Sequence, residues 1–285
     1  MTSQPFKVEK ADKTPFHWKS DIAWKNRTRI VVRGYDVNEL TGNLDFGQML
    51  FLVLKGELPT PAQAKITNAM MVSLAEHAMS PSSATVRFAT SGGAELNGAV
   101  SAGVAAIGRL HGTADRPANM FIGVEKRADE EGISIEEAAR LTVAEMRARR
   151  ENMPGYHHAQ HIRDPRTVRL MELSDKLGIT GKYVTIARAM EDATEEVFGR
   201  RLWINGPGAM GCIGLDAGYT PIEMKAMFIT ARTLSLCAHS IEESITEKGW
   251  RASENSDMVQ PLSLQMQGPD WYNGPADRHL PDIEA

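Results

Sequence analysis

Asn152-Met-Pro-Gly-Tyr-His-His-Ala-Gln-His-Ile-Arg-Asp-Pro-Arg166 is the stretch around which the fold and the chemistry of this chain are organised. It holds three histidines, two arginines, two prolines, a glycine and an aspartate. Histidine titrates near neutral pH, and Arg166 in an Asp-Pro-Arg turn presents a planar fork to a carboxylate or phosphate. The plainest interpretation is a polar surface loop between two helices. A metal site at His157, His158 and His161 is a weaker hypothesis, because no cysteine or acidic ligand joins them at a standard spacing.

Helix signals lie on both sides of this loop. Before it, Ser134-Ile-Glu-Glu137 predicts a capping box and an amphipathic helix to about Arg150. After it, the pattern predicts helices over 167–177 and 183–198, each ended by a glycine. Leu202-Trp-Ile-Asn-Gly-Pro-Gly-Ala209 is interpreted as a glycine- and proline-rich hinge before an apolar segment, and Thr220-Pro-Ile-Glu223 opens a long helix to about Ile245.

The N-terminal half is organised in the same way. Residues 1–30 are expected to form a polar arm suited to wrapping a second subunit, and 29–35 predict a short strand that ends in a turn at Gly34. Asp36 is expected to cap a short helical turn, and Asp45 to cap a helix over 46–55 that stops at Gly56. Thr60-Pro opens a further helix to about His77. The small-residue-rich stretch 84–108 predicts two buried helices that meet near Gly92-Gly93.

The class prediction is therefore a mainly α protein. The 285 residues are 42% hydrophobic and 24% charged, with a net charge of −4, so the chain is an ordinary globular protein with no sign of a nucleic-acid partner. No apolar run is long enough to span a membrane, and no signal peptide is visible. Cys212 and Cys237 lie in apolar segments, which favours reduced thiols and a cytoplasmic location.

Six motifs in order resemble the citrate synthase superfamily, most of all its short citryl-CoA lyase branch, from about Trp18 to Pro281. Any one of them is weak evidence, but their common order is strong. They are Arg33-Gly-Tyr-Asp-Val-Asn-Glu-Leu40 with Leu54-Lys-Gly-Glu-Leu-Pro-Thr60, Glu76-His-Ala-Met-Ser-Pro-Ser-Ser83, Leu110-His-Gly-Thr-Ala114, Pro154-Gly-Tyr-His-His158 with Asp164-Pro-Arg166, Arg232-Thr-Leu-Ser-Leu-Cys-Ala-His-Ser-Ile-Glu-Glu243, and Tyr272-Asn-Gly-Pro with Arg278 and Leu-Pro281.

The resemblance implies a large helical domain (1–112 and 217–285) and a small one (113–216), in a homodimer. It implies an enzyme that joins or splits a C–C bond of an acyl-CoA, with coenzyme A as substrate carrier and no permanently bound cofactor. Such chemistry needs a neutral hydrogen-bond donor for the thioester oxygen, a proton-transfer group near the carbonyl, and arginines for carboxylates.

By resemblance, His111 would be the thioester-oxygen donor, and His158 would face the carbonyl or carbinol oxygen. Arg166 and Arg232 would bind a carboxylate, with Arg251 reaching across the dimer. The other two loop histidines, His157 and His161, are grouped with the substrate-binding residues, and no metal is expected. His157 stands where the family has glycine, so the catalytic role falls on either of the two adjacent histidines.

One departure from the family changes the expected chemistry. The family's base is an aspartate in Leu-Pro-Leu-Asn-Val-Asp-Gly-Ala, where this chain keeps Asn205, Gly208 and Ala209 but has Pro207 in place of the aspartate. Proline cannot accept a proton, so ordinary enolisation of acetyl-CoA is not expected. No histidine within 84–110 matches the family's additional carboxylate-contacting histidine, which argues against oxaloacetate.

Three functions therefore stay open. The first is an atypical CoA-dependent lyase or condensing enzyme acting on a carboxylate-bearing 3-hydroxyacyl-CoA such as citryl-CoA. The second is a non-catalytic paralogue that binds a CoA ester or a partner, and the third is a CoA-thioester hydrolase. On the long helix, His239, Glu242 and Glu243 are expected to form a structural hydrogen-bond cluster rather than catalytic groups.

Overall fold

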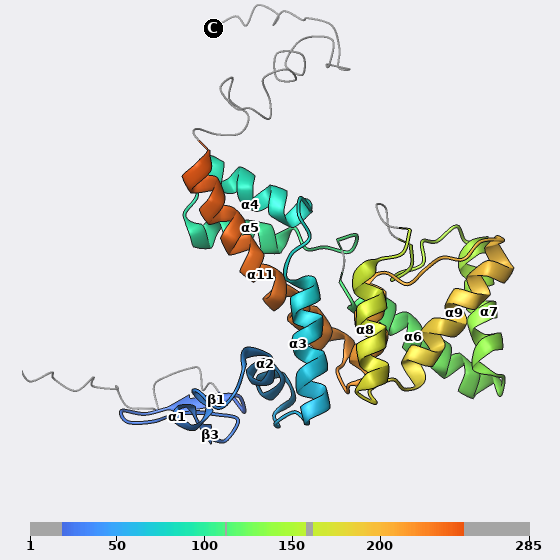
Figure 1. The fold of residues 1–285 in the computed structure, drawn as a ribbon, viewed down its shortest axis with the longest axis horizontal. Coiled ribbons are helices and arrows are strands. Elements are labelled where there is room, and N and C mark those ends of the chain that lie inside the picture. Colours follow the sequence, from blue (N-terminus) through green and yellow to red (C-terminus); the bar gives the residue numbers. More distant parts are fainter. Residues whose placement is uncertain (1–18, 112, 158–161, 248–285) are drawn as a thin grey trace, which may run out of the picture. The chain divides into compact units, whose positions relative to one another are not determined.

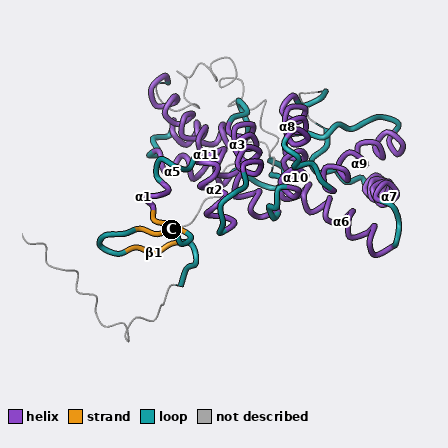
Figure 2. The backbone as a smooth tube through the Cα atoms, turned by 60° about the horizontal axis from the view of Figure 1, so that its bottom comes forward, coloured by secondary structure: helices purple, strands orange, loops and turns teal. Residues whose placement is uncertain are grey.

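The computed structural model describes residues 19–111, 113–157 and 162–247. The chain forms two compact units, which divide between Asn68 and Ala69. Helices dominate the described residues, and the strands are confined to the N-terminal unit (Figure 1, Figure 2). The prediction of a mainly α fold is confirmed.

The N-terminal unit begins with a small antiparallel sheet in the order β1 (Ala23–Lys25), β2 (Ile30–Val32) and β3 (Tyr35–Asp36). The predicted turn at Gly34 is present, with a φ of 90°, and the strand predicted before it is β2. Strand β3, which follows the turn, was not predicted. Strand β1 lies inside the segment that was expected to be an irregular arm, so that expectation is wrong for residues 23–25.

Helices α1 (Val37–Leu40) and α2 (Phe46–Lys55) follow the sheet, and both predicted caps are present. Asp45 and Gln48 form a complete capping box, and Gly56 ends α2 with a φ of 86°. Val32, Leu40 and Leu52 form the apolar core of this unit.

The remaining helices are α3, which crosses the boundary between the two units, and eight helices of the C-terminal unit. Their bounds are α3 (Pro61–Ala75), α4 (Pro81–Ser91), α5 (Leu96–Ala105), α6 (Asp115–Glu131), α7 (Ile135–Ala148), α8 (Pro165–Lys176), α9 (Lys182–Phe198), α10 (Gly206–Asp216) and α11 (Pro221–Thr246). None of these described helices is both long and apolar enough to cross a membrane.

Helices α4 and α5 confirm the predicted pair that meets at Gly92-Gly93. They pack on each other and on α11 (Figure 1). The approach is close at Gly103, where a Cβ would lie 3.0 Å from the carbonyl oxygen of Ser82. The expectation that both are fully buried is wrong for the single chain. Phe88 is 50% exposed and Leu96 46%, because only one side of the pair faces α11.

Two further helices differ from the sequence prediction. Helix α6 was not anticipated, because its charged end at 125–131 obscures the helical spacing of the buried residues Ala118, Phe121, Val124 and Ala128. In α7 the predicted capping box is half formed. Ser134 accepts from the backbone N–H of Glu137 at 3.2 Å, but the Glu137 carboxylate pairs with Arg140 instead of returning to the cap.

Helix α10 is buried on almost all sides, against α6, α8, α9 and α11. The Gly206-Pro-Gly208 run, interpreted from the sequence as a hinge, forms the first turn of this helix and is capped by Asn205. Its glycines permit close packing, since a Cβ on Gly211 would lie 3.1 Å from the backbone nitrogen of Ala118. The hinge interpretation is therefore wrong for 206–209, which are part of a buried helix.

Candidate active site

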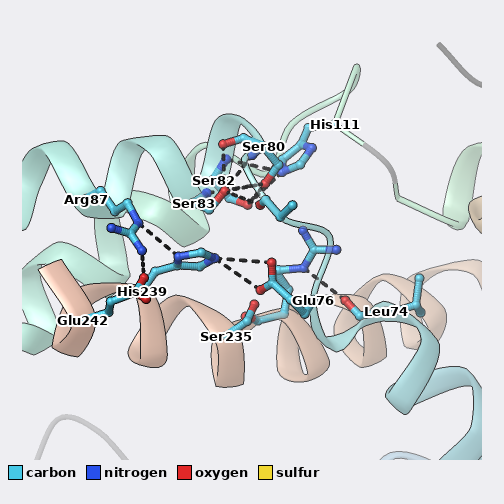
Figure 3. A network of polar contacts seen from close by, with 12 residues as sticks. Leu74, Glu76, Ser80, Ser82, Ser83, Arg87, His111, Ser235, His239 and Glu242 are labelled. Carbon is cyan, nitrogen blue, oxygen red and sulfur yellow. Dashed lines mark hydrogen bonds and ion pairs between the residues drawn. The ribbon is translucent and has the colours of Figure 1, made fainter. Parts of the chain in front are cut away.

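His111 lies in the loop between α5 and α6 and is held by the first turn of α4. The backbone N–H of Ser82 donates to His111 Nε2 at 3.4 Å, and the Ser82 hydroxyl lies 2.8 Å from the same atom (Figure 3). Because a backbone N–H can only donate, Nε2 is the acceptor and the ring proton sits on Nδ1. Nδ1 makes no hydrogen bond within the described residues, so its N–H is available to a ligand.

The surroundings of His111 keep its imidazole neutral. Burial lowers its pKa below the ordinary value, and the nearby charges of Arg232 and His77 lower it further. The positive end of the α4 dipole acts in the same direction. A neutral imidazole with a free Nδ1–H can donate a hydrogen bond to a developing oxyanion.

Arg166 is oriented by Asp164, the N-cap of α8. Its Nε donates to Asp164 Oδ1 at 3.0 Å and its Nη2 to Oδ2 at 2.7 Å, while Gly206 N–H donates to Oδ2 at 2.9 Å. Burial alone would raise the pKa of Asp164, but Arg166 and the backbone donors bring it down to about 2. Asp164 thus links the guanidinium of Arg166 to the first turn of α10. Arg166 Nη1 has no hydrogen-bond partner among the described residues.

Arg232 lies on α11 and is only 3% exposed. Its Nε donates to the carbonyl oxygen of Leu74 at 3.0 Å, and its guanidinium lies over the Phe228 ring, 5.4 Å from the centroid. Burial lowers its pKa, the charge of Glu76 opposes that effect, and the charge of Arg166 adds to it. Both Nη nitrogens lack a hydrogen-bond partner within the described residues. The buried Arg232, which lies near Arg166, can therefore donate hydrogen bonds to a ligand.

His77 completes this cluster and was not predicted as a site residue. Burial lowers its pKa, and Arg166 and Arg232 lower it further by repulsion. The sequence signal for His77 was the Glu76-His pair in the motif before α4. The family's carboxylate-contacting histidine had been expected within 84–110 instead. His77, His111, Arg166 and Arg232 therefore converge on one region, where the balancing carboxylates are Asp164 and Glu76. The two guanidinium charges are matched by the two carboxylates, but the free donor atoms of Arg166, Arg232 and His111 are suited to binding an anionic ligand.

The loop that ends at His157 is fastened to the segment before α10. His157 N–H donates to the carbonyl oxygen of Trp203 at 2.8 Å, Asn205 N–H donates to that of Gly155 at 2.9 Å, and Asn205 Nδ2 donates to that of His157 at 2.7 Å. His157 has a φ of 63°, in the left-handed region that favours glycine. This conformation gives a physical reason for the glycine that the resembling family has at the same place.

Pro207 occupies the first turn of α10, between Gly206 and Gly208. A Cβ on Gly206 would lie 3.0 Å from Arg166 Nη2, and one on Gly208 would lie 2.2 Å from the carbonyl oxygen of Gly155. Gly208 has no room for a side chain, and one on Gly206 would displace the Arg166–Asp164 pair, so Pro207 is the position of this turn that accommodates a side chain. It carries no proton acceptor.

A hollow of about 540 Å³ is lined by Arg109 and Leu110, which precede His111 in the chain, and by residues of α6, of α7 and of the segment after α7. Met120, Met146 and Leu110 provide apolar surface, and Leu110 is 80% exposed. The polar residues and the proline of its lining are Arg109, Arg116, Asn119, Glu151, Asn152 and Pro154. The combination of apolar surface and two arginines is suited to an elongated ligand that bears phosphates.

Three of the predicted site residues, His158, His161 and Arg251, lie outside the described residues. The metal hypothesis rests on two of them and stays untested. Within the described ranges no group of three or more His, Cys, Asp or Glu side chains is arranged to hold a metal ion.

The predicted structural cluster on α11 is present. Arg87 of α4 pairs with Glu242 and with Glu243, and it also donates to His239 (Figure 3). Glu243 is 2% exposed, so this cluster fastens α4 to α11 and does not form a second active site.

Comparison with known proteins points in one direction. Residues 59–253 match the family model described as "Citrate synthase, C-terminal domain". The chain is 31% identical over 234 residues to "Putative citrate synthase 2" of Mycobacterium tuberculosis (strain ATCC 25618 / H37Rv), covering 80% of this chain and 56% of that protein. It is 28% identical over 218 residues to "Citrate/2-methylcitrate synthase" of Bacillus subtilis (strain 168), covering 73% and 55%. The chain thus spans about half the length of these curated relatives.

Solved structures extend the similarity over almost the whole chain. Citryl-CoA lyase from Hydrogenobacter thermophilus is 33% identical with a TM-score of 0.78, and the match covers 93% of this chain and 97% of that one. ATP citrate lyase from Methanothrix soehngenii, in complex with citrate and coenzyme A, is 20% identical with a TM-score of 0.69, and the match covers 81% of this chain and 39% of that one. The second likeness is one of fold.

Proposed function

The chain belongs to the citrate synthase family, and on that premise we propose that it is a CoA-dependent carbon–carbon lyase or condensing enzyme. Its substrate would be a carboxylate-bearing 3-hydroxyacyl-CoA such as citryl-CoA. The observation that carries the proposal is the convergence of a neutral His111 with His77, Arg166 and Arg232. Such a substrate needs one hydrogen-bond donor for its enolate oxygen and several donors for its carboxylates.

We propose that the chain acts in the direction of cleavage, in which proton transfer at the α-carbon is the last step; the missing base affects that step in both directions. In cleavage, a base removes the proton of the substrate hydroxyl and the C–C bond breaks. The hydroxyl carbon becomes a carbonyl, and the bonding electron pair passes to the thioester enolate. His111 Nδ1–H stabilises the enolate oxygen, and the α-carbon then takes a proton from water or from the histidine that accepted the hydroxyl proton. We assign the first proton transfer to His158 or to its neighbour His157. This direction does not begin with removal of an α-proton, the step for which Pro207 is unsuited.

The carboxylates of the substrate would be held by Arg166 and Arg232, with His77 as a further contact. Because His77 is present, the lack of a histidine within 84–110 no longer argues against oxaloacetate as the carbonyl product. Arg251 and His161 remain proposed contacts. The hollow lined by Arg109 and Arg116, among others, would take the coenzyme A arm, with these two arginines facing its phosphates. Coenzyme A enters as substrate carrier, and we propose no permanently bound cofactor and no metal.

We further propose a homodimer, in the cytoplasm. The mutually packed helices α4, α5 and α11 carry large exposed apolar side chains, and monomeric proteins seldom expose large apolar patches. These side chains are Phe88, Leu96, Leu234, Ile241 and Ile245, with exposures from 46% to 76%. The division into a large domain (1–112 and 217–285) and a small one (113–216) stays a prediction.

The experiment that tests the proposed function is incubation of the full chain with citryl-CoA, with product analysis by mass spectrometry. We expect acetyl-CoA and oxaloacetate to form with wild type and not with His111→Ala. Binding of citryl-CoA without turnover would support the non-catalytic alternative, which Pro207 favours. Release of citrate and free CoA would indicate thioester hydrolysis instead.

A further inference from the structure

The cluster between α4 and α11 reaches the site through Glu76, the residue immediately before His77. His239 Nε2 lies 3.3 Å from both carboxylate oxygens of Glu76 (Figure 3). On the other side of the ring, Arg87 Nε donates to His239 Nδ1 at 3.1 Å. An arginine N–H can only donate, so Nδ1 is the acceptor and the ring hydrogen is on Nε2, where it is donated to Glu76.

Arg87 is itself held firmly. Its side chain is only 14% exposed, and its Nη1 lies 2.9 Å from Glu243, whose side chain is 1% exposed. A guanidinium keeps its charge and its planar geometry, so this pairing fixes the direction of the Nε–H toward His239. The result is an ordered chain of contacts from the buried Glu243 to the half-exposed Glu76.

Glu76 lies close to Arg232 without binding it. Its charge opposes the loss of charge on the buried Arg232, yet no ion pair joins the two side chains within the described residues. Because Glu76 does not bind Arg232, the Nη nitrogens of Arg232 have no hydrogen-bond partner within the described residues. Burial raises the pKa of Glu76, but Ser235 and His239 outweigh that effect, so the net pKa lies below the ordinary value. Glu76 is therefore a charged carboxylate placed next to a cation that the substrate is expected to use.

We propose that Arg87 and His239 are positioning residues that restrain Glu76, so that its carboxylate does not occupy Arg232 in competition with the substrate. The proposal rests on the proposed function, because the carboxylate-bearing substrate is the ligand that Glu76 would displace. If the restraint is removed, Glu76 turns toward the free edge of Arg232. The affinity for the substrate carboxylate then falls, while the affinity for coenzyme A does not.

Variants at position 239 separate the two contacts of the ring. His239→Asn keeps an acceptor near the place of Nδ1 but loses the donor to Glu76, whereas His239→Gln keeps a donor that reaches Glu76. We expect His239→Asn to raise the KM for citryl-CoA about tenfold, about 1.4 kcal/mol of binding free energy, with kcat and the Kd for CoA nearly unchanged. His239→Gln should stay close to wild type.

The decisive measurement is the double variant His239→Asn/Glu76→Gln. A glutamine at 76 cannot compete as an anion, so the double variant should recover most of the lost affinity. The matched control is Ser240→Ala, which removes the 2.7 Å hydroxyl contact between Thr90 and Ser240 and thus another link between α4 and α11. It should leave the KM unchanged. If His239→Asn is too unstable to assay, Arg87→Lys, which keeps a charge for Glu243 but loses the planar fork, should raise the KM in the same way.

The outcomes separate the restraint from the proposed function. A double variant as impaired as His239→Asn, or a Ser240→Ala defect of equal size, overturns the restraint, because a loss of helix packing would explain both. Unchanged KM in His239→Asn also overturns it and leaves the proposed function standing. Absence of citryl-CoA binding and cleavage in wild type overturns both.

Discussion

Replacing Pro207 with aspartate should restore a base for α-proton removal. Position 207 is the second residue of α10. It lies in the turn that the Asp164–Arg166 pair of α8 binds through the Gly206 N–H. The existing proline ring shows that a Cβ fits there. The new carboxylate would lie next in the chain to Gly206, where a Cβ would be 3.0 Å from Arg166 Nη2, and a guanidinium at that range favours the ionised form.

The cost to folding should be small. Loss of the proline constraint on the unfolded chain destabilises by about 0.4–1 kcal/mol. A carboxylate in the first turn of a helix stabilises by about 0.3–1 kcal/mol, so the two terms nearly cancel. A positioned general base contributes a rate factor of about 10²–10⁴. Because the neighbouring cations weaken the basicity of the new carboxylate, we expect the lower end, about 100-fold.

The assay is exchange of the methyl protons of acetyl-CoA with deuterated water, followed by mass spectrometry. Wild type should exchange at the background rate and Pro207→Asp about 100-fold faster. Pro207→Asn is the control, because it has the same size and no proton-accepting group. Equal exchange in the two variants, with CoA bound and the fold intact in both, would refute the assignment of Pro207 to the position of the lost base.

Four further outcomes are expected. His111→Asn should lower kcat for cleavage by about 10²–10³ with little change in KM, since the Nδ1–H acts mainly on the enolate, and steady-state kinetics checks this. Arg166→Met should raise the KM and, by leaving the buried Asp164 unpaired, lower the unfolding free energy in urea by about 3–5 kcal/mol. The pKa values of His77 and His111 are depressed in the folded chain, so the unfolded chain takes up protons at a higher pH than the folded chain does. The stability that the two histidines contribute is therefore complete above about pH 6.5 and is lost as the pH falls through their lower folded values. Urea titrations from pH 8 to 5 should show a decline in the unfolding free energy that His111→Asn reduces. Leu234→Glu should dissociate the proposed dimer in sedimentation experiments, and a monomeric wild type would contradict that interface.

Local signals predicted much of the fold. Helix starts at Asp45, Thr60 and Thr220 follow from side chains that accept the free N–H groups of a first turn, and each is present. Long-range effects were missed. Gly206-Pro-Gly208 has low intrinsic helix propensity, but burial among four helices and the Asn205 cap override it.

Site residues that belong to a recognisable motif were predictable from the sequence. Site residues whose role depends on tertiary packing were not. The Asp-Pro-Arg turn indicated Arg166, and the structure adds the reason for its orientation in Asp164. His77 was missed although its motif was identified, because the Glu76-His pair does not by itself show that the histidine joins the cluster. Its place in the cluster comes from how α3, α8 and α11 are arranged, which a local pattern does not encode. The roles of the site residues, and of His158, His161 and Arg251 outside the described residues, remain predictions.

The contact between Gly155 and Gly208 has a consequence for motion. With no side chain between the two backbones, and with the hydrogen bonds that join 155–157 to 203–205, the loop cannot slide over α10 without breaking several of these bonds at once. The loop and the helix should therefore move as one body. The backbone amides of His157 and Asn205 should exchange with solvent at a common slow rate, and widening either glycine should speed both together.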